Sequence, residues 1–180
     1  MTVRTLATTP YADQKPGTSG LRKRVKVFQQ PNYVENFVQA GLQALSPSGP
    51  ANATLVVGGD GRFFVAEAVL AILRVCGGNG VRKVVVGKDG ILSTPAASHL
   101  IRKLRADGGI LCTASHNPGG PDADFGIKFN TASGGPAPEG VTDRLFAIAK
   151  TVTELRVIDI PSVCRHSLIW LSASAWSFWD

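Results

Sequence analysis

The chain has 180 residues, of which 44% are hydrophobic and 18% are charged, and its formal net charge is +6. This length suits one α/β domain whose core folds without disulfides or metals, and the composition excludes a chain that is disordered throughout. The positive charge favours anionic partners such as sugar phosphates, nucleic acids or acidic lipid surfaces, without choosing among them.

Targeting signals are absent from the sequence. No stretch has the length of a transmembrane helix, and the amino-terminal region lacks the apolar run and cleavage site of a secretory signal. The cysteines, Cys76, Cys112 and Cys164, do not have the paired spacing of metal ligands and are expected as reduced thiols. We therefore expect a cytoplasmic protein that neither crosses a membrane nor is secreted.

A basic run follows a glycine-bounded turn near the amino terminus. The turn is Gly17–Gly20, and the run consists of Arg22, Lys23, Arg24 and Lys26. No aromatic residue interrupts the run before Phe28, so the stacking groups of a nucleic-acid site are missing. Such a run usually forms a solvated face, and nucleic acid is not an expected partner.

Hydrophobic spacing predicts alternating helices and strands along the next part of the chain. Helices are expected at residues 34–45, 65–76, 94–104 and 139–152, and strands at 54–57, 84–86, 110–112 and 125–129. Glycine and proline clusters separate these segments. The alternation predicts a three-layer α/β/α domain with a mixed, mostly parallel sheet over residues 1–160.

A small, polar, glycine-rich turn follows the apolar strand at 110–112. The rule that ligands bind beyond the carboxyl ends of strands in open α/β sheets places the Ser115 hydroxyl at a crevice, with His116 and Asn117 beside it. Gly119 and Gly120 would allow close backbone approach. The same residue types also form ordinary loops, so the turn alone does not establish a site.

The strand predicted at 125–129 has one aromatic face. Phe125, Ile127 and Phe129 alternate with Gly126 and Lys128, so Lys128 should point away from the core into polar surroundings.

Several motifs in one order resemble a known family. Residues 113–120, Thr-Ala-Ser-His-Asn-Pro-Gly-Gly, resemble the phosphoserine loop of phosphoglucomutases in the α-D-phosphohexomutase superfamily, and segments 13–22, 87–95 and 124–130 continue the resemblance. It extends over residues 11–160 and is similar in form to the glucose-specific branch. It covers the first domain of the family's architecture.

The resemblance implies roles for individual residues. Ser115 would carry the phosphate, His116 and Lys128 would supply positive charge and proton transfer, and Lys128 would be the general acid/base. Substrate contacts are implied for Thr18, Ser19, Arg22 and Asn117, of which Asn117 also shapes the loop.

The implied reaction interconverts glucose 1-phosphate and glucose 6-phosphate, with glucose 1,6-bisphosphate as the activating intermediate. The resemblance also implies magnesium, with one ligand from the phosphate on Ser115. The family's Asp-Gly-Asp-Gly-Asp-Arg magnesium loop does not occur in this sequence, and Asp60-Gly61-Arg62 is no substitute. We therefore expect little or no mutase turnover from this chain alone.

The last segment, 161–180, diverges from the family and contains every tryptophan of the chain. If exposed, its aromatic residues would form an apolar patch suited to protein contact or aggregation. We interpret it as the end of a truncated or alternatively spliced product; a native terminal segment packed on the sheet is the alternative.

Two other functions stay open at the level of sequence. A hydrolase would use Ser115 with His116, but adjacent side chains on a turn seldom reach each other and no G-x-S-x-G motif occurs. A non-catalytic interaction module derived from a mutase domain would use the basic run or the tail to bind a partner.

Overall fold

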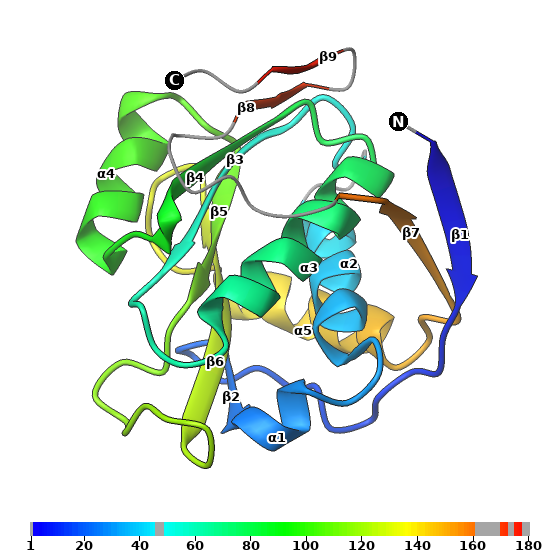
Figure 1. The fold of residues 1–180 in the computed structure, drawn as a ribbon, viewed down its shortest axis with the longest axis vertical. Coiled ribbons are helices and arrows are strands. Elements are labelled where there is room, and N and C mark those ends of the chain that lie inside the picture. Colours follow the sequence, from blue (N-terminus) through cyan, green and yellow to red (C-terminus); the bar gives the residue numbers. More distant parts are fainter. Residues whose placement is uncertain (1, 46–48, 161–169, 173–174, 178–180) are drawn as a thin grey trace.

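The protein is described here by a computed structural model that covers residues 2–45, 49–160, 170–172 and 175–177 (Figure 1). The elements in chain order are β1 (Val3–Ala7), β2 (Leu21–Arg24), α1 (Val25–Phe28), α2 (Tyr33–Leu45), β3 (Thr54–Gly59), α3 (Val65–Gly78), β4 (Lys83–Ile91), α4 (Thr94–Lys103), β5 (Gly108–Cys112), β6 (Asp124–Thr131), α5 (Glu139–Ala149), β7 (Glu154–Ile158), β8 (Trp170–Ser172) and β9 (Ala175–Ser177).

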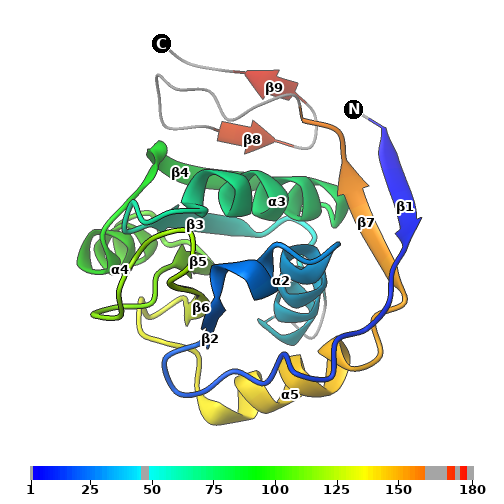
Figure 2. The ribbon, with the colours of Figure 1, turned by 60° about the horizontal axis from the view of Figure 1, so that its bottom comes forward.

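A five-stranded sheet in the order β2-β6-β5-β3-β4 forms the middle layer. Strands β3, β4 and β5 pair in parallel, whereas β6 runs antiparallel to both β5 and β2. One helix, α4, covers one face of the sheet, and α2 and α3 cover the other (Figures 1 and 2). The predicted three-layer fold with a mixed, mostly parallel sheet is confirmed.

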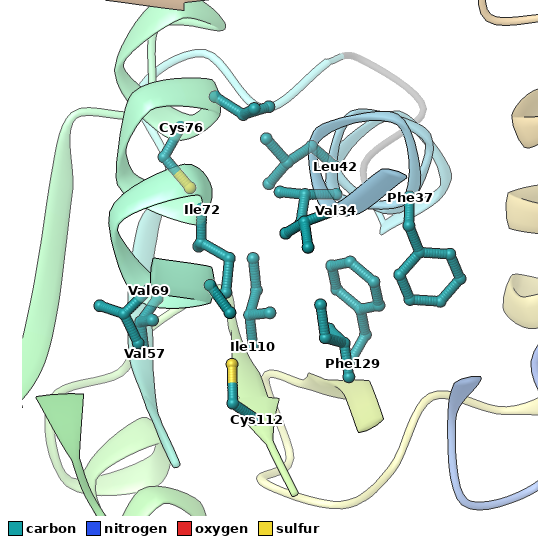
Figure 3. Packing of buried hydrophobic residues seen from close by; sticks show 14 of the residues in the cluster. Val34, Phe37, Leu42, Val57, Val69, Ile72, Cys76, Ile110, Cys112 and Phe129 are labelled. Carbon is teal, nitrogen blue, oxygen red and sulfur yellow. The ribbon is translucent and has the colours of Figure 1, made fainter. Parts of the chain in front are cut away.

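The larger core lies between the sheet and helices α2 and α3 (Figure 3). Val57, Ile110 and Phe129 project from the strands into this core, and Ile72 enters it from α3. A smaller cluster on the opposite face joins Ala97 and Ile101 of α4 to the sheet. Alternation along the strands therefore supplies apolar contacts to both helical layers.

Strand β6 has the two faces that its sequence predicts. Phe125, Ile127 and Phe129 are buried in the larger core, while Lys128 is half-buried on the opposite side of the strand. The Phe129 ring packs so closely on α2 that a Cβ at Gly41 would overlap it. A helical glycine is therefore needed at this crossing.

A second, two-stranded sheet was not predicted. It pairs β1 with β7 in antiparallel register, with Val3 opposite Ile158. The helix predicted at 139–152 is wrong at its carboxyl end, because α5 ends at Ala149 and Lys150 caps it. The chain then turns toward β7, and Val152 is buried beyond the helix rather than within it.

The two cysteines that the structure describes lie in the core. Cys76 and Cys112 are buried, free thiols, and burial raises the pKa of Cys76 to about 12. Cys164 and the side chains of the predicted tail, 161–180, lie outside the described residues. In the described part of the chain, every helix is too short or too polar to cross a bilayer.

The Gly41 crossing can be tested by a pair of glycine substitutions. We expect Gly41→Ala to destabilise the fold by about 2 kcal/mol or more, because the added methyl must displace the Phe129 ring. Gly140→Ala in α5 meets open space and should instead stabilise the protein by up to about 1 kcal/mol through helix propensity. Urea unfolding measures the change in unfolding free energy for both variants. Equal changes would contradict the close packing of Phe129 on Gly41.

Candidate active site

Ser115 lies just past the carboxyl end of β5, as expected, and is exposed. Its φ of 56° puts its backbone in the left-handed region, which residues other than glycine rarely adopt. The hydroxyl of Thr113 accepts a hydrogen bond from the Ser115 backbone N–H at 2.9 Å. The serine is therefore presented on a tight, polar turn rather than packed into the core.

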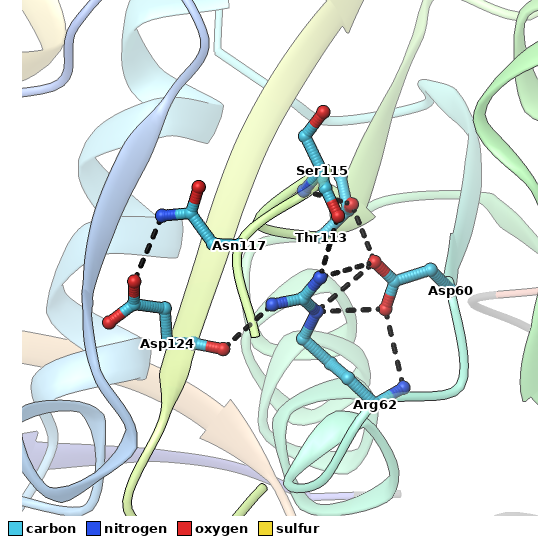
Figure 4. Close-up of polar contacts among 6 residues, drawn as sticks. All are labelled: Asp60, Arg62, Thr113, Ser115, Asn117 and Asp124. Atoms are coloured by element: carbon cyan, nitrogen blue, oxygen red, sulfur yellow. Dashed lines mark hydrogen bonds and ion pairs between the residues drawn. The ribbon is translucent and has the colours of Figure 1, made fainter. Parts of the chain in front are cut away.

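Arg62 holds this turn from the neighbouring strand end (Figure 4). Its Nη2 donates to the carbonyl oxygen of Ser115 at 3.1 Å, and its Nη1 donates to the carbonyl oxygen of Asp124 at 2.8 Å. Its Nε and Nη2 also bind the Asp60 carboxylate. With a side chain only 7% exposed, Arg62 ties the loop after β3 to both ends of the connection between β5 and β6.

Asp60 completes this polar clamp, which we define as Asp60, Arg62 and Thr113. The Thr113 hydroxyl donates to Asp60 Oδ2 at 2.7 Å. Burial tends to raise the pKa of Asp60, but hydrogen bonds from Arg62 and Thr113 outweigh it and hold the pKa below its ordinary value. The carboxylate is therefore ionised at neutral pH and already engaged.

A tight hairpin turn brings two more hydroxyls to the site. Gly17 and Gly20 exchange backbone hydrogen bonds of 3.0 Å, leaving Thr18 and Ser19 at the tip. A Cβ at Gly20 would clash with the Ile127 carbonyl oxygen and the Lys128 side chain. Glycine at this position thus lets the hairpin lie directly against Lys128.

Two cations lie near each other on β2 and β6. The Arg22 side chain crosses Gly126, where a Cβ would lie 3.1 Å from Arg22 Cγ. Its Nε is buried and has no hydrogen-bond partner in the part of the chain that the structure describes. Burial lowers the pKa of Lys128, and the charge of Arg22 lowers it further. An anion bound here would accept a hydrogen bond from Arg22 Nε and would offset the positive charges of Arg22 and Lys128.

A cleft of about 290 Å³ joins these groups. Among the residues that the structure describes, its walls combine cations and hydroxyls and contain no carboxylate; they are formed by Thr18, Ser19, Arg22, Thr94, Thr113, Ser115, Lys128 and Pro136. Apart from Thr113, the lining hydroxyls have no hydrogen-bond partner within the described residues. This inventory matches a ligand that carries both phosphate and hydroxyl groups.

Two predicted site residues lie outside this lining. His116 is exposed beside Ser115 and does not line the cleft. Asn117 turns to the other side, where its Nδ2 donates to Asp124 Oδ2 at 2.9 Å (Figure 4). The contact places Asn117 in the support of the loop, whereas Ser115, Lys128, Thr18, Ser19 and Arg22 share the cleft.

The described residues do not form a magnesium site. No three of their His, Cys, Asp and Glu side chains are grouped closely enough to hold a metal. Near Ser115, Asp60 is bound by Arg62 and Thr113, and Asp124 by Asn117. A hard cation needs several oxygen ligands, and these carboxylates are already engaged.

Sequence reasoning missed the clamp and Thr94. The signal was present: Asp60-Gly61-Arg62 follows β3, and β3 pairs in parallel with β5, so their carboxyl ends meet at one edge. Thr94 begins α4, and its sequence context, followed by Pro95, indicates only a helix start.

Comparison with known proteins supports a family relationship. The family described as phosphoglucomutase/phosphomannomutase, alpha/beta/alpha domain I, matches residues 13–156. The phosphoglucomutase of Schizosaccharomyces pombe is 57% identical over 159 residues, which are 88% of this chain and 28% of that protein. Human phosphoglucomutase-1 is 59% identical over 154 residues, which are 85% of this chain and 27% of the human protein.

A solved structure gives the same relationship. The open form of the Paramecium phosphoglucomutase pp63/parafusin superposes with a TM-score of 0.85 at 47% identity, covering 88% of this chain and 29% of that one. The chain thus spans less than a third of the length of each of these proteins.

The clamp can be tested by removing its guanidinium. Arg62→Met keeps much of the side-chain volume but leaves Asp60 and two carbonyl oxygens without their donor, so we expect a loss of about 2 kcal/mol in unfolding free energy. Amide exchange of residues 113–119 should become faster. Lys26→Met, which removes an exposed ion pair with Asp122, serves as the control and should change neither measurement.

The electrostatics of the cleft predict a coupled titration. Removing the positive charge in Arg22→Gln should raise the pKa of Lys128 toward its ordinary value, without reaching it, because burial remains the larger cause. NMR titration of the lysine side-chain carbons measures this shift. Arg24→Gln on the same strand should leave the Lys128 pKa unchanged, and an unchanged pKa in Arg22→Gln would contradict the coupling.

Proposed function

Because this chain belongs to the phosphoglucomutase/phosphomannomutase family, matching its α/β/α domain I, we propose that Ser115 carries a phosphoryl group and exchanges it with a phosphorylated hexose. The observation that supports this most directly is one cleft. The Ser115 hydroxyl, the Arg22 guanidinium and the Lys128 ammonium share it, and no carboxylate among the described residues lines it to repel a phosphate.

In the proposed reaction, phosphoserine 115 transfers its phosphoryl group to the C6 hydroxyl of glucose 1-phosphate. The bond between phosphorus and the serine oxygen breaks, a bond to the C6 oxygen forms, and the hydroxyl proton passes to a base. The product is glucose 1,6-bisphosphate. The bisphosphate then reorients in the site, so that its C1 phosphate lies next to Ser115. That phosphoryl group passes to Ser115 and glucose 6-phosphate leaves, and no nucleotide is consumed.

Lys128 is the proposed general acid/base. Its lowered pKa increases the share of the neutral amine that can accept the hydroxyl proton, and the resulting ammonium can return a proton to the leaving oxygen. Arg22 stays charged and stabilises the negative charge on the transferring phosphoryl oxygens. His116, exposed beside Ser115, would add positive charge at the edge of the site when protonated.

The hairpin hydroxyls suit the sugar. Thr18 and Ser19 are exposed at the cleft and have no partner among the described residues, so they can bond the hexose hydroxyls. Asn117 would act indirectly, by holding the loop through Asp124.

Magnesium enters the proposal only through the phosphate on Ser115, one oxygen of which would be a ligand of the metal. The described side chains do not supply the remaining ligands, and the proposed steps involve only groups of this chain and the sugar phosphate. We propose that the chain performs the half-reaction at Ser115 and that turnover comparable to that of the longer relatives needs groups that this cleft does not contain.

The competing functions have less support. A serine hydrolase needs a base in contact with the nucleophile, but His116 does not line the cleft. An interaction module would use the basic run, yet Lys23, Arg24 and Lys26 each face a carboxylate within 3.6 Å. That run therefore presents less free charge than the sequence suggests.

Phosphate transfer to Ser115 is directly measurable. After incubation with glucose 1,6-bisphosphate, intact mass spectrometry and peptide mapping should find one phosphate, on Ser115. Ser115→Ala should incorporate none, and Lys128→Met should incorporate it at least about a hundredfold more slowly, as expected for loss of a general acid/base. Ser133→Ala, an exposed serine outside the cleft, should behave as wild type. Phosphate at another residue would contradict the proposal.

A further inference from the structure

Of the described residues that line the cleft, Thr94 is the one contributed by a helix. It is the first residue of α4, whereas the cations and the other hydroxyls come from β2, β6 and the turns beside them. The sequence motifs and the family resemblance gave it no role beyond starting the helix.

The hydroxyl of Thr94 is not needed to begin α4. Ser93 is the N-cap, and its Oγ accepts a hydrogen bond from the backbone N–H of Ala96 at 3.4 Å. Pro95 has no N–H to satisfy. Because the Thr94 hydroxyl has no partner within the described residues, it is available to a ligand.

The start of α4 is held firmly relative to Lys128. Ala97 and Ile101 are fully buried against the sheet, and the Ser98 hydroxyl accepts a hydrogen bond from Asn130 Nδ2 at 3.3 Å. Asn130 follows Lys128 by two residues and lies on the same face of β6. The hydroxyl of Thr94 and the ammonium of Lys128 are therefore carried by elements that a side-chain hydrogen bond links through Ser98 and Asn130.

We propose that Thr94 is a phosphate-binding residue, whose hydroxyl donates a hydrogen bond to an oxygen of a phosphate held in the cleft beside Ser115. Its part in phosphoryl transfer rests on the proposed function. Arg22 and Lys128 supply charge, while a hydroxyl fixed at the start of a helix supplies direction, and the partial positive charge of the helix start favours an anion. The lone pairs of the threonine oxygen remain free for water.

Inorganic phosphate provides a test on the whole chain. Amide chemical shifts followed during a phosphate titration should give a dissociation constant about tenfold weaker for Thr94→Val than for wild type, as expected for loss of one hydrogen bond to a charged group. Thr94→Ser keeps the hydroxyl and should restore wild-type affinity. Thr5→Val, which removes an exposed hydroxyl on β1, should bind phosphate as wild type does.

Equal affinities of Thr94→Val and wild type would overturn this assignment. So would Thr94→Ser binding as weakly as Thr94→Val, or a wild-type protein that binds no phosphate. Incorporation of phosphate at Ser115 is measured in parallel on the same samples. Its absence would count against the proposed function alone, because phosphate affinity reports on Thr94 independently of transfer.

Discussion

The backbone of Ser115 depends on the clamp formed by Asp60, Arg62 and Thr113. A left-handed conformation costs a residue other than glycine about 1–2 kcal/mol. Hydrogen bonds from Arg62 to the Ser115 carbonyl oxygen, and from the Ser115 N–H to Thr113, are of a size to offset that cost. The clamp therefore fixes the turn of Ser115, the proposed phosphate carrier, without using its hydroxyl.

The rest of the site follows from close backbone contacts around that turn. Gly20 lets the hairpin approach Lys128, and Gly126 lets Arg22 cross β6 toward Thr113. These contacts bring two cations together, and the described residues place no carboxylate in the cleft wall. Burial lowers the pKa of Lys128, the charge of Arg22 lowers it further, and Arg22 Nε has no hydrogen-bond partner among the described residues. The protein bears this electrostatic cost in the absence of ligand, and a bound phosphate would relieve it.

Local patterns predicted much of this architecture, because regular apolar spacing determines which faces of α2, α3 and β6 are buried. Strand β1 escaped prediction since it is exposed and pairs with β7 from the far end of the sequence. The same limit applied to the site. Ser115 and Lys128 were found through their motifs, whereas the contact of Arg62 with Ser115 joins residues 53 positions apart and exists only after β3 and β5 pair.

The most direct test of this account is a crystal structure of the protein soaked with tungstate, a phosphate analogue whose anomalous scattering identifies its position. The account predicts the anion in the cleft, within hydrogen-bonding distance of Ser115 and Arg22, with Ser115 still in its left-handed conformation. Tungstate bound only elsewhere on this basic protein, or a Ser115 hydroxyl turned away from the cleft, would contradict it.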